Sequence, residues 1–236
     1  MVPSLTIIVP FYNEARTLNK LVKEIEQLPR NVYKQVVFVN DGSKDKSEQI
    51  LQAALVASKI PHVYMYKSNG GKASAVMWGL EKANTTHAVI LDADLELKVS
   101  DLSKLWNLIV SGEADAVFGY RNFKSHSSYT YRYAIGNRFI SNFYGIIFNQ
   151  LVTDIMCGYK LFPVSSKVHF PRRISGYAIE IAIPSALWRT GIKPYEIEVS
   201  YKPRNRHEGK IINSFDAIKV MFAIIKFRMV VRANNN

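Results

Sequence analysis

The chain has 236 residues, of which 48% are hydrophobic and 21% charged, a composition that excludes a disordered protein and suits one globular domain. Cys157 is the only cysteine, which excludes an intrachain disulfide, and no stretch approaches the roughly 20 apolar residues that a membrane-spanning helix needs. The net charge of +12 comes wholly from residues 119–236, because residues 1–118 hold 13 basic and 13 acidic side chains. This excess indicates an anionic partner, either phosphate groups or an anionic membrane, and no helix-turn-helix or aromatic RNA-binding pattern points to nucleic acid.

The first half of the chain alternates between predicted strands and predicted helices. Short apolar runs predict five strands, at residues 5–9, 36–39, 62–66, 88–91 and 116–120. Apolar residues at helical spacing predict four helices, at residues 18–28, around 50–55, 72–83 and around 102–109. This order is typical of an α/β fold with a mostly parallel central sheet and helices on both faces.

The second half is less regular and contains more predicted helix than strand. We predict helices at about 131–150, 178–189 and 213–232, and a strand at 196–201. The apolar face expected for the first of these helices consists of Ile135, Phe139, Ile140, Phe143 and Ile147. The last helix is predicted to be amphipathic, because one set of apolar residues recurs at steps of three and four. These residues are Phe215, Ile218, Phe222, Ile225 and Met229.

Polar side chains follow four of the predicted strands, at the point where each strand ends. The four segments are Tyr12-Asn13-Glu14, Asn40-Asp41-Gly42-Ser43, Asp92-Ala93-Asp94 and Gly119-Tyr120-Arg121. In open sheets of parallel strands, ligands bind beyond the carboxyl ends of the strands. The sequence therefore predicts a binding site at this edge of the sheet.

Asp92 and Asp94 are the best candidates for metal ligands. In an extended segment their side chains point the same way and their Cα atoms lie roughly 6.5 Å apart. Carboxylates so close repel each other unless they share a cation, and their hard oxygen atoms suit Mg²⁺ or Mn²⁺. Glu96 is a candidate third ligand. The alternative for Asp92-Ala93-Asp94 is a solvated turn that caps the start of a helix. Gly70-Gly71-Lys72, at the start of a predicted helix, is a candidate phosphate site through its backbone N–H groups and the lysine ammonium.

Six segments, taken in chain order, carry a resemblance to a known family. They are Val9-Pro10-Phe11-Tyr12-Asn13-Glu14, Val39-Asn40-Asp41-Gly42-Ser43, Asn69-Gly70-Gly71-Lys72, Asp92-Ala93-Asp94, Gly119-Tyr120-Arg121 and Cys157-Gly158-Tyr159-Lys160-Leu161-Phe162. Together they closely resemble the motifs of the family-2 glycosyltransferases of GT-A fold. Within that family the chain is most similar to the polyprenyl-phosphate sugar synthases, such as the dolichyl-phosphate mannose and dolichyl-phosphate glucose synthases. The resemblance covers about residues 4–210 and implies a Rossmann-like nucleotide-sugar-binding fold.

The resemblance implies a nucleotide-sugar site in the first half of the chain. The positions that match the family's base and ribose contacts are Pro10, Tyr12, Glu14, Val39 and Asp41. Asp92 and Ala93 match donor-binding positions, and Lys72 is expected to lie beside the donor phosphates. The family's usual Asp-Asp-Gly-Ser reads Asn40-Asp41-Gly42-Ser43 here, so only the first side chain departs from the pattern.

The resemblance also implies the catalytic and phosphate-binding positions. Asp94 and Arg121 match the family's catalytic carboxylate and the arginine near the diphosphate, and the implied metal ligands are Asp92, Asp94 and Glu96. Glu96 stands where many relatives have glutamine. A late basic motif that contacts phosphate or acceptor pairs an arginine with a lysine. Either Arg204 or Arg206 matches that arginine, and Lys210 matches the lysine.

These positions predict an inverting glycosyltransferase that moves a hexose from a nucleotide sugar to a polyprenyl or dolichyl phosphate. The departing nucleoside diphosphate gains negative charge, which a metal ion on Asp92 and Asp94, with Arg121 and Lys72, would stabilise. A phosphate acceptor is already an anion and needs no general base. The Glu-Asp and Gln-x-x-Arg-Trp motifs of hydroxyl-directed relatives are missing, because neither a Glu-Asp nor an Arg-Trp dipeptide occurs in the sequence.

Two alternatives stay open at this point. The chain could instead add a sugar to a hydroxyl of a lipid-linked or surface glycan, with Glu180 as the candidate base. It could also be a non-catalytic subunit that binds a nucleotide sugar. Both UDP-glucose and GDP-mannose are compatible with the resemblance as donors.

The expected location is the cytoplasmic face of a membrane, with the protein bound peripherally. We expect a catalytic domain at residues 1–212, with a nucleotide-sugar-binding half at 1–118 and an acceptor-side half at 119–212. Residues 213–236 are expected to form an amphipathic helix and a tail. The apolar stripe of this helix and its basic residues suit a helix that lies in an anionic membrane interface. The alternative is an ordinary helix packed on the domain.

Overall fold

The computed structural model describes residues 2–123, 131–171, 173–203 and 214–233. Its strands are β1 (Leu5–Phe11), β2 (Gln35–Asn40), β3 (His62–Tyr66), β4 (His87–Ile90), β5 (Val117–Arg121), β6 (Lys160–Pro163) and β7 (Tyr195–Val199). Its α-helices are α1 (Leu18–Glu26), α2 (Ser47–Val56), α3 (Lys72–Lys82), α4 (Leu102–Val110), α5 (Tyr131–Phe148), α6 (Ile179–Thr190) and α7 (Ser214–Ala233). Short 3-10 helices lie at Val99–Asp101, Val164–His169 and Gly176–Ala178.

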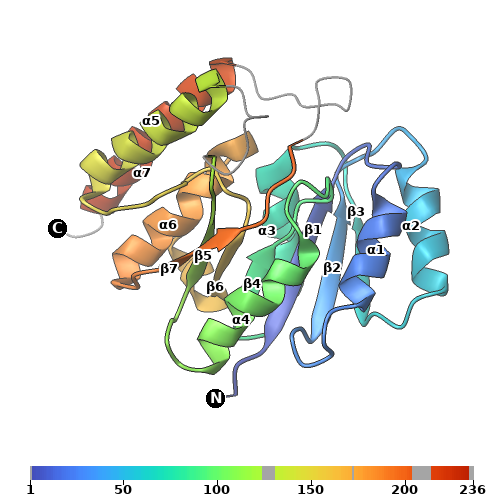
Figure 1. The fold of residues 1–236 in the computed structure, drawn as a ribbon. Helices are drawn as coiled ribbons and strands as arrows, with labels where there is room; N and C mark the ends of the chain where they lie inside the picture. The colour runs from blue at the N-terminus through green and yellow to red at the C-terminus, as the bar shows by residue number, and fades with distance from the viewer. Residues whose placement is uncertain (1, 124–130, 172, 204–213, 234–236) are drawn as a thin grey trace.

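The strands form one sheet of seven, in the order β3-β2-β1-β4-β6-β5-β7 (Figure 1). All neighbouring strands run parallel except β6, which is antiparallel to both β4 and β5. Leu161 of β6 is in register with Val89 on one side and Val117 on the other. The predicted mostly parallel α/β sheet is therefore confirmed, but the sequence analysis did not predict β6.

Helices cover both faces of the sheet, which explains why the strands read as continuous apolar runs. Successive side chains of a strand point to opposite faces. Ile7 and Val9 of β1 accordingly pack with residues of α1, α2 and α4. Ile8 lies between them and packs on the other face with residues of α3, α5, α6 and α7. Figure 1 shows these two layers, with α1, α2 and α4 on one side of the sheet.

The outer layer on the second face is a pair of helices, α5 and α7, which pack against each other, with α7 also on α6 (Figure 1). The apolar face predicted for α5 is partly wrong. Ile135 and Phe139 are 48% and 56% exposed, whereas Ile140, Tyr144 and Phe148 are buried. The apolar residues of α5 are spread around most of its circumference, so hydrophobic periodicity alone did not identify the buried side.

Helix α7 carries apolar residues on two sides, one buried and one exposed. Its inner side is buried in the core through Val220, Ala223, Ile224 and Phe227. Its outer side carries the predicted stripe, of which Ile218, Phe222, Ile225 and Met229 are exposed. The side chain of Phe215, also assigned to that stripe, is outside the part of the chain that the structure describes. Among the described residues, no helix is both long enough and apolar enough to cross a membrane.

Candidate active site

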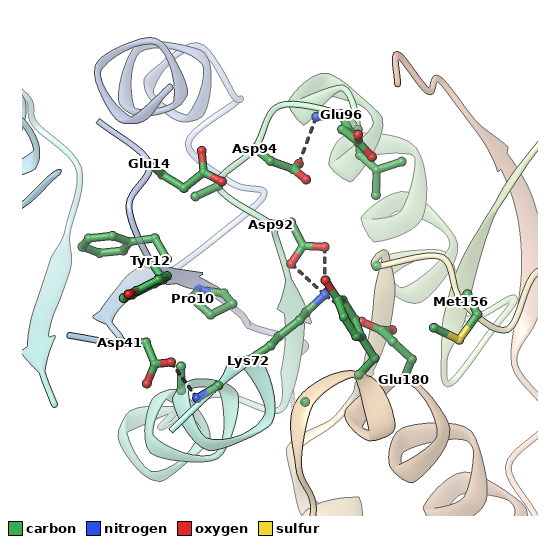
Figure 2. Close-up of a pocket in the computed structure, with 18 of the residues that line it drawn as sticks. Pro10, Tyr12, Glu14, Asp41, Lys72, Asp92, Asp94, Glu96, Met156 and Glu180 are labelled. Carbon is green, nitrogen blue, oxygen red and sulfur yellow. Dashed lines mark hydrogen bonds and ion pairs between the residues drawn. The ribbon is translucent and has the colours of Figure 1, made fainter. Parts of the chain in front are cut away.

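A cavity of about 450 Å³ opens at the edge of the sheet where the parallel strands end (Figure 2). It collects side chains that follow β1, β2, β4, β5 and β7, as expected for an open parallel sheet. Among the residues that line it are Pro10, Tyr12, Glu14, Asp41, Lys72, Asp92, Ala93, Asp94, Glu96 and Arg121. The structure thus places these candidate residues, from five separate segments of the sequence, around one space.

Four candidate residues are not placed at this cavity. The side chain of Val39 is fully buried in a small cluster with Val37 and Ala75, between β2 and α3. Arg204, Arg206 and Lys210 lie outside the described residues.

Asp41 anchors the turn that leads into α3. Its Oδ1 accepts hydrogen bonds from Lys67 Nζ at 2.6 Å and from the Gly70 N–H at 3.0 Å. Its Oδ2 accepts the Gly71 N–H at 2.7 Å. These glycine N–H groups, which were predicted to be a candidate phosphate site, donate in the structure to a buried carboxylate. Gly71 adopts a φ of 81°, in the left-handed region that glycine tolerates best.

Lys72, the first residue of α3, bridges two carboxylates on the wall of the cavity. Its Nζ lies 2.7 Å from Asp92 Oδ1 and 2.8 Å from Asp92 Oδ2. The same ammonium lies 2.7 Å from Oε1 of Glu180, which is in the first turn of α6. Figure 2 shows the Lys72 side chain extending from α3 toward Asp92, with Glu180 beside it. Although burial alone would lower the pKa of Lys72, the charges of Asp92 and Glu180 raise it, so the ammonium stays protonated.

Glu180 is buried and is held by two lysines. Its second oxygen, Oε2, lies 2.5 Å from the Nζ of Lys160, which is also buried. Lys160 donates a further hydrogen bond to the Cys157 carbonyl oxygen. Burial by itself would raise the pKa of Glu180, but Lys160 and Lys72 bring it below its ordinary value. A carboxylate that holds two ammonium groups is a poor general base, which argues against the base role considered for Glu180.

Asp94 and Glu96 lie on the opposite side of Asp92 from Lys72 (Figure 2). Asp94 Oδ1 accepts the backbone N–H of Glu96 at 3.0 Å, and Leu95 between them has a φ of 58°. Gly158 packs against Asp92, since a Cβ on Gly158 would lie 2.5 Å from Asp92 Oδ2. The glycine of the Cys157-Gly158-Tyr159 segment is therefore needed for Asp92 to occupy its place.

Asp92 and Asp94 could hold a divalent cation together with the phosphates of a bound substrate, but not as a complete set of protein ligands. Within the described ranges, no three histidine, cysteine or acidic side chains are grouped closely enough to enclose a metal ion. Asp92 is engaged by Lys72, and Asp94 lies beside it in the same cavity. Mg²⁺ is commonly held by one or two carboxylates and by substrate phosphates, not by a cage of protein ligands. The donor set at Asp92 and Asp94 is compatible with that arrangement.

Arg121 forms the far wall of the cavity and is tied to Asp154. Its Nε and Nη2 donate to the two carboxylate oxygens of Asp154, at 2.6 Å and 2.9 Å. Three aromatic rings surround the guanidinium, with Cζ 5.0, 5.2 and 5.9 Å from the ring centroids of Tyr201, Phe123 and Tyr133 respectively. Burial alone would lower the pKa of Arg121, but the charge of Asp154 raises it. The guanidinium is thus a fixed positive charge at the cavity.

Several residues that shape the site were not recognised from the sequence. Asp154 and Lys67 had no motif to mark them, and their partners Arg121 and Asp41 are 33 and 26 residues away. Lys160 belongs to a motif that was noted, but its ion pair with Glu180 depends on the unpredicted strand β6.

Comparisons with known proteins show the family and the fold of the chain. A family model described as glycosyl transferase family 2 matches residues 6–167. The uncharacterized protein MJ0544 of Methanocaldococcus jannaschii is 29% identical, over 93% of this chain and 97% of its own length. The dolichyl-phosphate beta-glucosyltransferase ALG5D of Trichomonas vaginalis is 26% identical, over 97% of this chain and 74% of its own length.

A solved structure shows the same fold. Glucosyl-3-phosphoglycerate synthase from Mycobacterium tuberculosis, in complex with Mn²⁺, uridine diphosphate and phosphoglyceric acid, superposes with a TM-score of 0.71. The superposition covers 96% of this chain and 78% of that chain, at 14% sequence identity. At this identity the likeness concerns the fold.

Proposed function

The chain belongs to glycosyl transferase family 2, and we propose that it transfers a hexose from a nucleotide sugar to a polyprenyl or dolichyl phosphate, with inversion at the anomeric carbon. The main support for this proposal is that Lys72, Asp92 and Asp94 line one cavity, at the carboxyl ends of the parallel strands. An ammonium and a pair of carboxylates at this place suit a donor that leaves as a nucleoside diphosphate.

In this proposal different residues of the chain bind the nucleoside, the diphosphate and the sugar of the donor. Pro10, Tyr12, Glu14 and Asp41 are assigned to the nucleoside. The side chain of Val39 is buried between β2 and α3, so Val39 would contact the nucleoside only through its backbone. Lys72 and Arg121 supply positive charge toward the diphosphate, with Asp92 and Ala93 beside the sugar.

We assign the metal to Asp94 and Asp92, with Glu96 as an additional ligand. Mg²⁺ or Mn²⁺ bound there would neutralise charge on the departing diphosphate. Lys72 contacts both oxygens of Asp92, so in this arrangement Asp92 would be shared between the ammonium and the metal. The Mn²⁺ in the complex of the M. tuberculosis synthase supports a divalent cation in this fold.

The state of Glu180 favours a phosphate acceptor over a hydroxyl acceptor. A hydroxyl must lose a proton as it attacks, whereas a phosphate oxygen is already negative. Glu180, the candidate base, is engaged by Lys72 and Lys160. The name of the T. vaginalis relative, a dolichyl-phosphate glucosyltransferase, supports the same acceptor class. Arg204 or Arg206, with Lys210, would add positive charge around the acceptor phosphate.

A polyprenyl phosphate lies in a membrane, so the chain must work at a membrane surface, and we place it at the cytoplasmic face. The exposed apolar stripe of α7 and the exposed Ile135 and Phe139 of the neighbouring α5 support a place at a membrane surface. Exposed Lys219 and Lys226 add positive charge beside the stripe of α7. Such a surface suits the interface of an anionic bilayer.

A panel of labelled donors and acceptors tests the proposal. UDP-glucose and GDP-mannose are each incubated with polyprenyl phosphate, with a glycan acceptor that offers hydroxyls, and without acceptor. We expect labelled lipid only with polyprenyl phosphate, and with UDP-glucose as the preferred donor. Transfer to the glycan acceptor alone would favour the hydroxyl-directed reaction. Binding of a donor with no transfer to any acceptor would favour a non-catalytic nucleotide-sugar-binding subunit.

A further inference from the structure

A buried ion pair, Lys160–Glu180, lies next to the Lys72 ammonium, which contacts Glu180. Lys160 begins β6 and Glu180 belongs to the first turn of α6, and both side chains are at most 2% exposed. Neither the phosphate-binding nor the metal-binding roles proposed above use this pair. Burying two charges requires compensation, and a buried pair is often no more stable than apolar residues of similar volume. The pair therefore calls for an explanation other than stability.

The geometry connects the pair to the cavity. Glu180 divides its two oxygens between two ammonium groups, with Oε2 on Lys160 and Oε1 on Lys72. Lys72 in turn contacts Asp92, whose side chain is 28% exposed at the cavity, whereas that of Glu180 is 2% exposed. The ammonium of Lys72 thus contacts the buried carboxylate of Glu180 on its inner side. On the cavity side it contacts the more exposed carboxylate of Asp92. Positive and negative charges alternate along Lys160, Glu180, Lys72 and Asp92.

A lysine side chain has four rotatable bonds and would otherwise sample many positions. With Glu180 on one side and Asp92 on the other, the ammonium of Lys72 is confined before a donor binds. Preorganised charge stabilises a developing negative charge without having to move during the reaction.

We propose that Glu180 is a positioning residue, which Lys160 holds in place and which fixes the Lys72 ammonium where the diphosphate of the donor binds. This inference rests on the proposed nucleotide-sugar site and names which residues prepare it. The simpler role for Glu180 is to neutralise the buried Lys160, with no effect on Lys72.

Removing both members of the pair separates the two roles. The double variant Lys160→Met/Glu180→Met leaves no unpaired buried charge and replaces the pair with side chains of similar length. We expect its melting temperature to stay near that of the wild type, whereas Glu180→Met alone lowers it because Lys160 is left unpaired. The informative measurement is the affinity for a nucleoside diphosphate relative to the matching monophosphate, by calorimetry.

In the wild type we expect the diphosphate to bind at least tenfold more tightly than the monophosphate. In the double variant this ratio falls at least threefold and kcat at least tenfold, with the monophosphate affinity unchanged. The variant Lys72→Met shows the same loss, and adding it to the double variant has no further effect, because all three act through one ammonium. A double variant with wild-type ratio and kcat would overturn the proposal and leave Glu180 as a counter-ion only.

Two further variants keep the test decisive. Asp101→Asn removes another buried carboxylate, one that pairs with Lys104 at 2.7 Å and does not line the cavity. It is expected to lower the melting temperature without changing the ratio of diphosphate to monophosphate affinity. An equal fall in its ratio would contradict the positioning role.

If the double variant does not fold, the variant Glu180→Asp decides between the two roles. It keeps the charge, but its side chain is one methylene too short to contact both lysines. Its ratio should fall, and a wild-type ratio would overturn the proposal. A wild-type chain that does not favour the diphosphate would instead contradict the nucleotide-sugar site itself.

Discussion

Arg121 and Asp154 are joined by two parallel hydrogen bonds at the wall of the cavity, from Nε at 2.6 Å and from Nη2 at 2.9 Å. The backbone N–H of Arg121 also donates to Asp154 Oδ2, at 3.2 Å. Both side chains are buried. Asp154 therefore determines both the position of the guanidinium and the path of the backbone at the end of β5.

The first prediction concerns this pair. Asp154→Asn leaves the buried guanidinium without its counter-charge, so we expect the free energy of unfolding to fall by about 3–5 kcal/mol. Urea denaturation measures this change. In the double variant Arg121→Met/Asp154→Leu most of the loss should be recovered, because no buried charge remains. A change below about 1 kcal/mol for Asp154→Asn would mean that the pair is not buried in solution.

The second prediction concerns the metal. Asp94→Ala should reduce transfer at least 100-fold while leaving the melting temperature within a few degrees of the wild type, because Asp94 is a half-buried side chain that lines the cavity. Excess EDTA should abolish transfer by the wild type, and added Mg²⁺ or Mn²⁺ should restore it. Full turnover in EDTA would exclude the metal role of Asp92, Asp94 and Glu96.

The third prediction concerns the late basic segment. Arg204→Ala, Arg206→Ala and Lys210→Ala should each fold normally, and at least one arginine variant and the lysine variant should lower kcat/KM for the phosphate acceptor about tenfold or more. The expected cause is the loss of positive charge beside the acceptor phosphate. Steady-state kinetics with varied acceptor concentration measures the effect. Wild-type turnover in all three variants would remove the segment from the site.

The fourth prediction concerns the membrane. The chain should co-sediment with anionic liposomes at low salt and less so at high salt, because each basic residue near the leaflet adds about 1 kcal/mol. The test keeps α7 in place, because its inner side is buried in the core and packs on α5 and α6. The variant is Phe222→Ser, which removes one exposed apolar side chain of α7, with Val56→Ser on α2 as its matched exposed control. If the full chain stays in the supernatant, or if Phe222→Ser binds as well as Val56→Ser does, the outer face of α7 does not bind membranes.

The fifth prediction concerns Cys157, whose thiol is fully buried. Burial, together with the charge of Asp154, raises its pKa to about 12. The native thiol should therefore react with a thiol-specific reagent at pH 8 only as fast as the protein unfolds. In the unfolded chain the thiol ionises above about pH 8.5 while the folded thiol does not, so its contribution to stability is lost as the pH rises from there toward 12. Cys157→Ala should lessen that loss, and rapid labelling of the native protein would show that the thiol is accessible.

The sequence predicted the fold best where local patterns determine structure. The alternation of strand and helix through residue 121 was recovered, because both faces of the sheet are buried and each strand is an apolar run. Strand β6 was missed because it has only four residues, begins with Lys160 and gains its place from β4 and β5. The buried side of α5 was partly misassigned because apolar residues occur on both of its sides.

For the site, the sequence located the candidates but not their partners. The carboxyl ends of parallel strands meet at one edge, so Tyr12, Asp41, Asp92 and Arg121 could be expected to gather there. Which charges pair depends on tertiary geometry, and the Lys72–Glu180 contact joins residues 108 positions apart. The assignment of the Gly70 and Gly71 N–H groups to phosphate did not anticipate that Asp41 would accept them.

The antiparallel strand β6 has a consequence during translation. Strand β5 is made well before β6, yet within the described part of the chain its strand neighbours in the sheet are β6 and β7. Until residue 163 has emerged from the ribosome, β4 has an open edge and β5 has no partner. At about 5–20 residues per second this interval lasts a few seconds. An unpaired apolar strand edge favours association with other chains. We therefore expect nascent chains paused between residues 121 and 160 to bind chaperones, and release from them to follow the synthesis of β6.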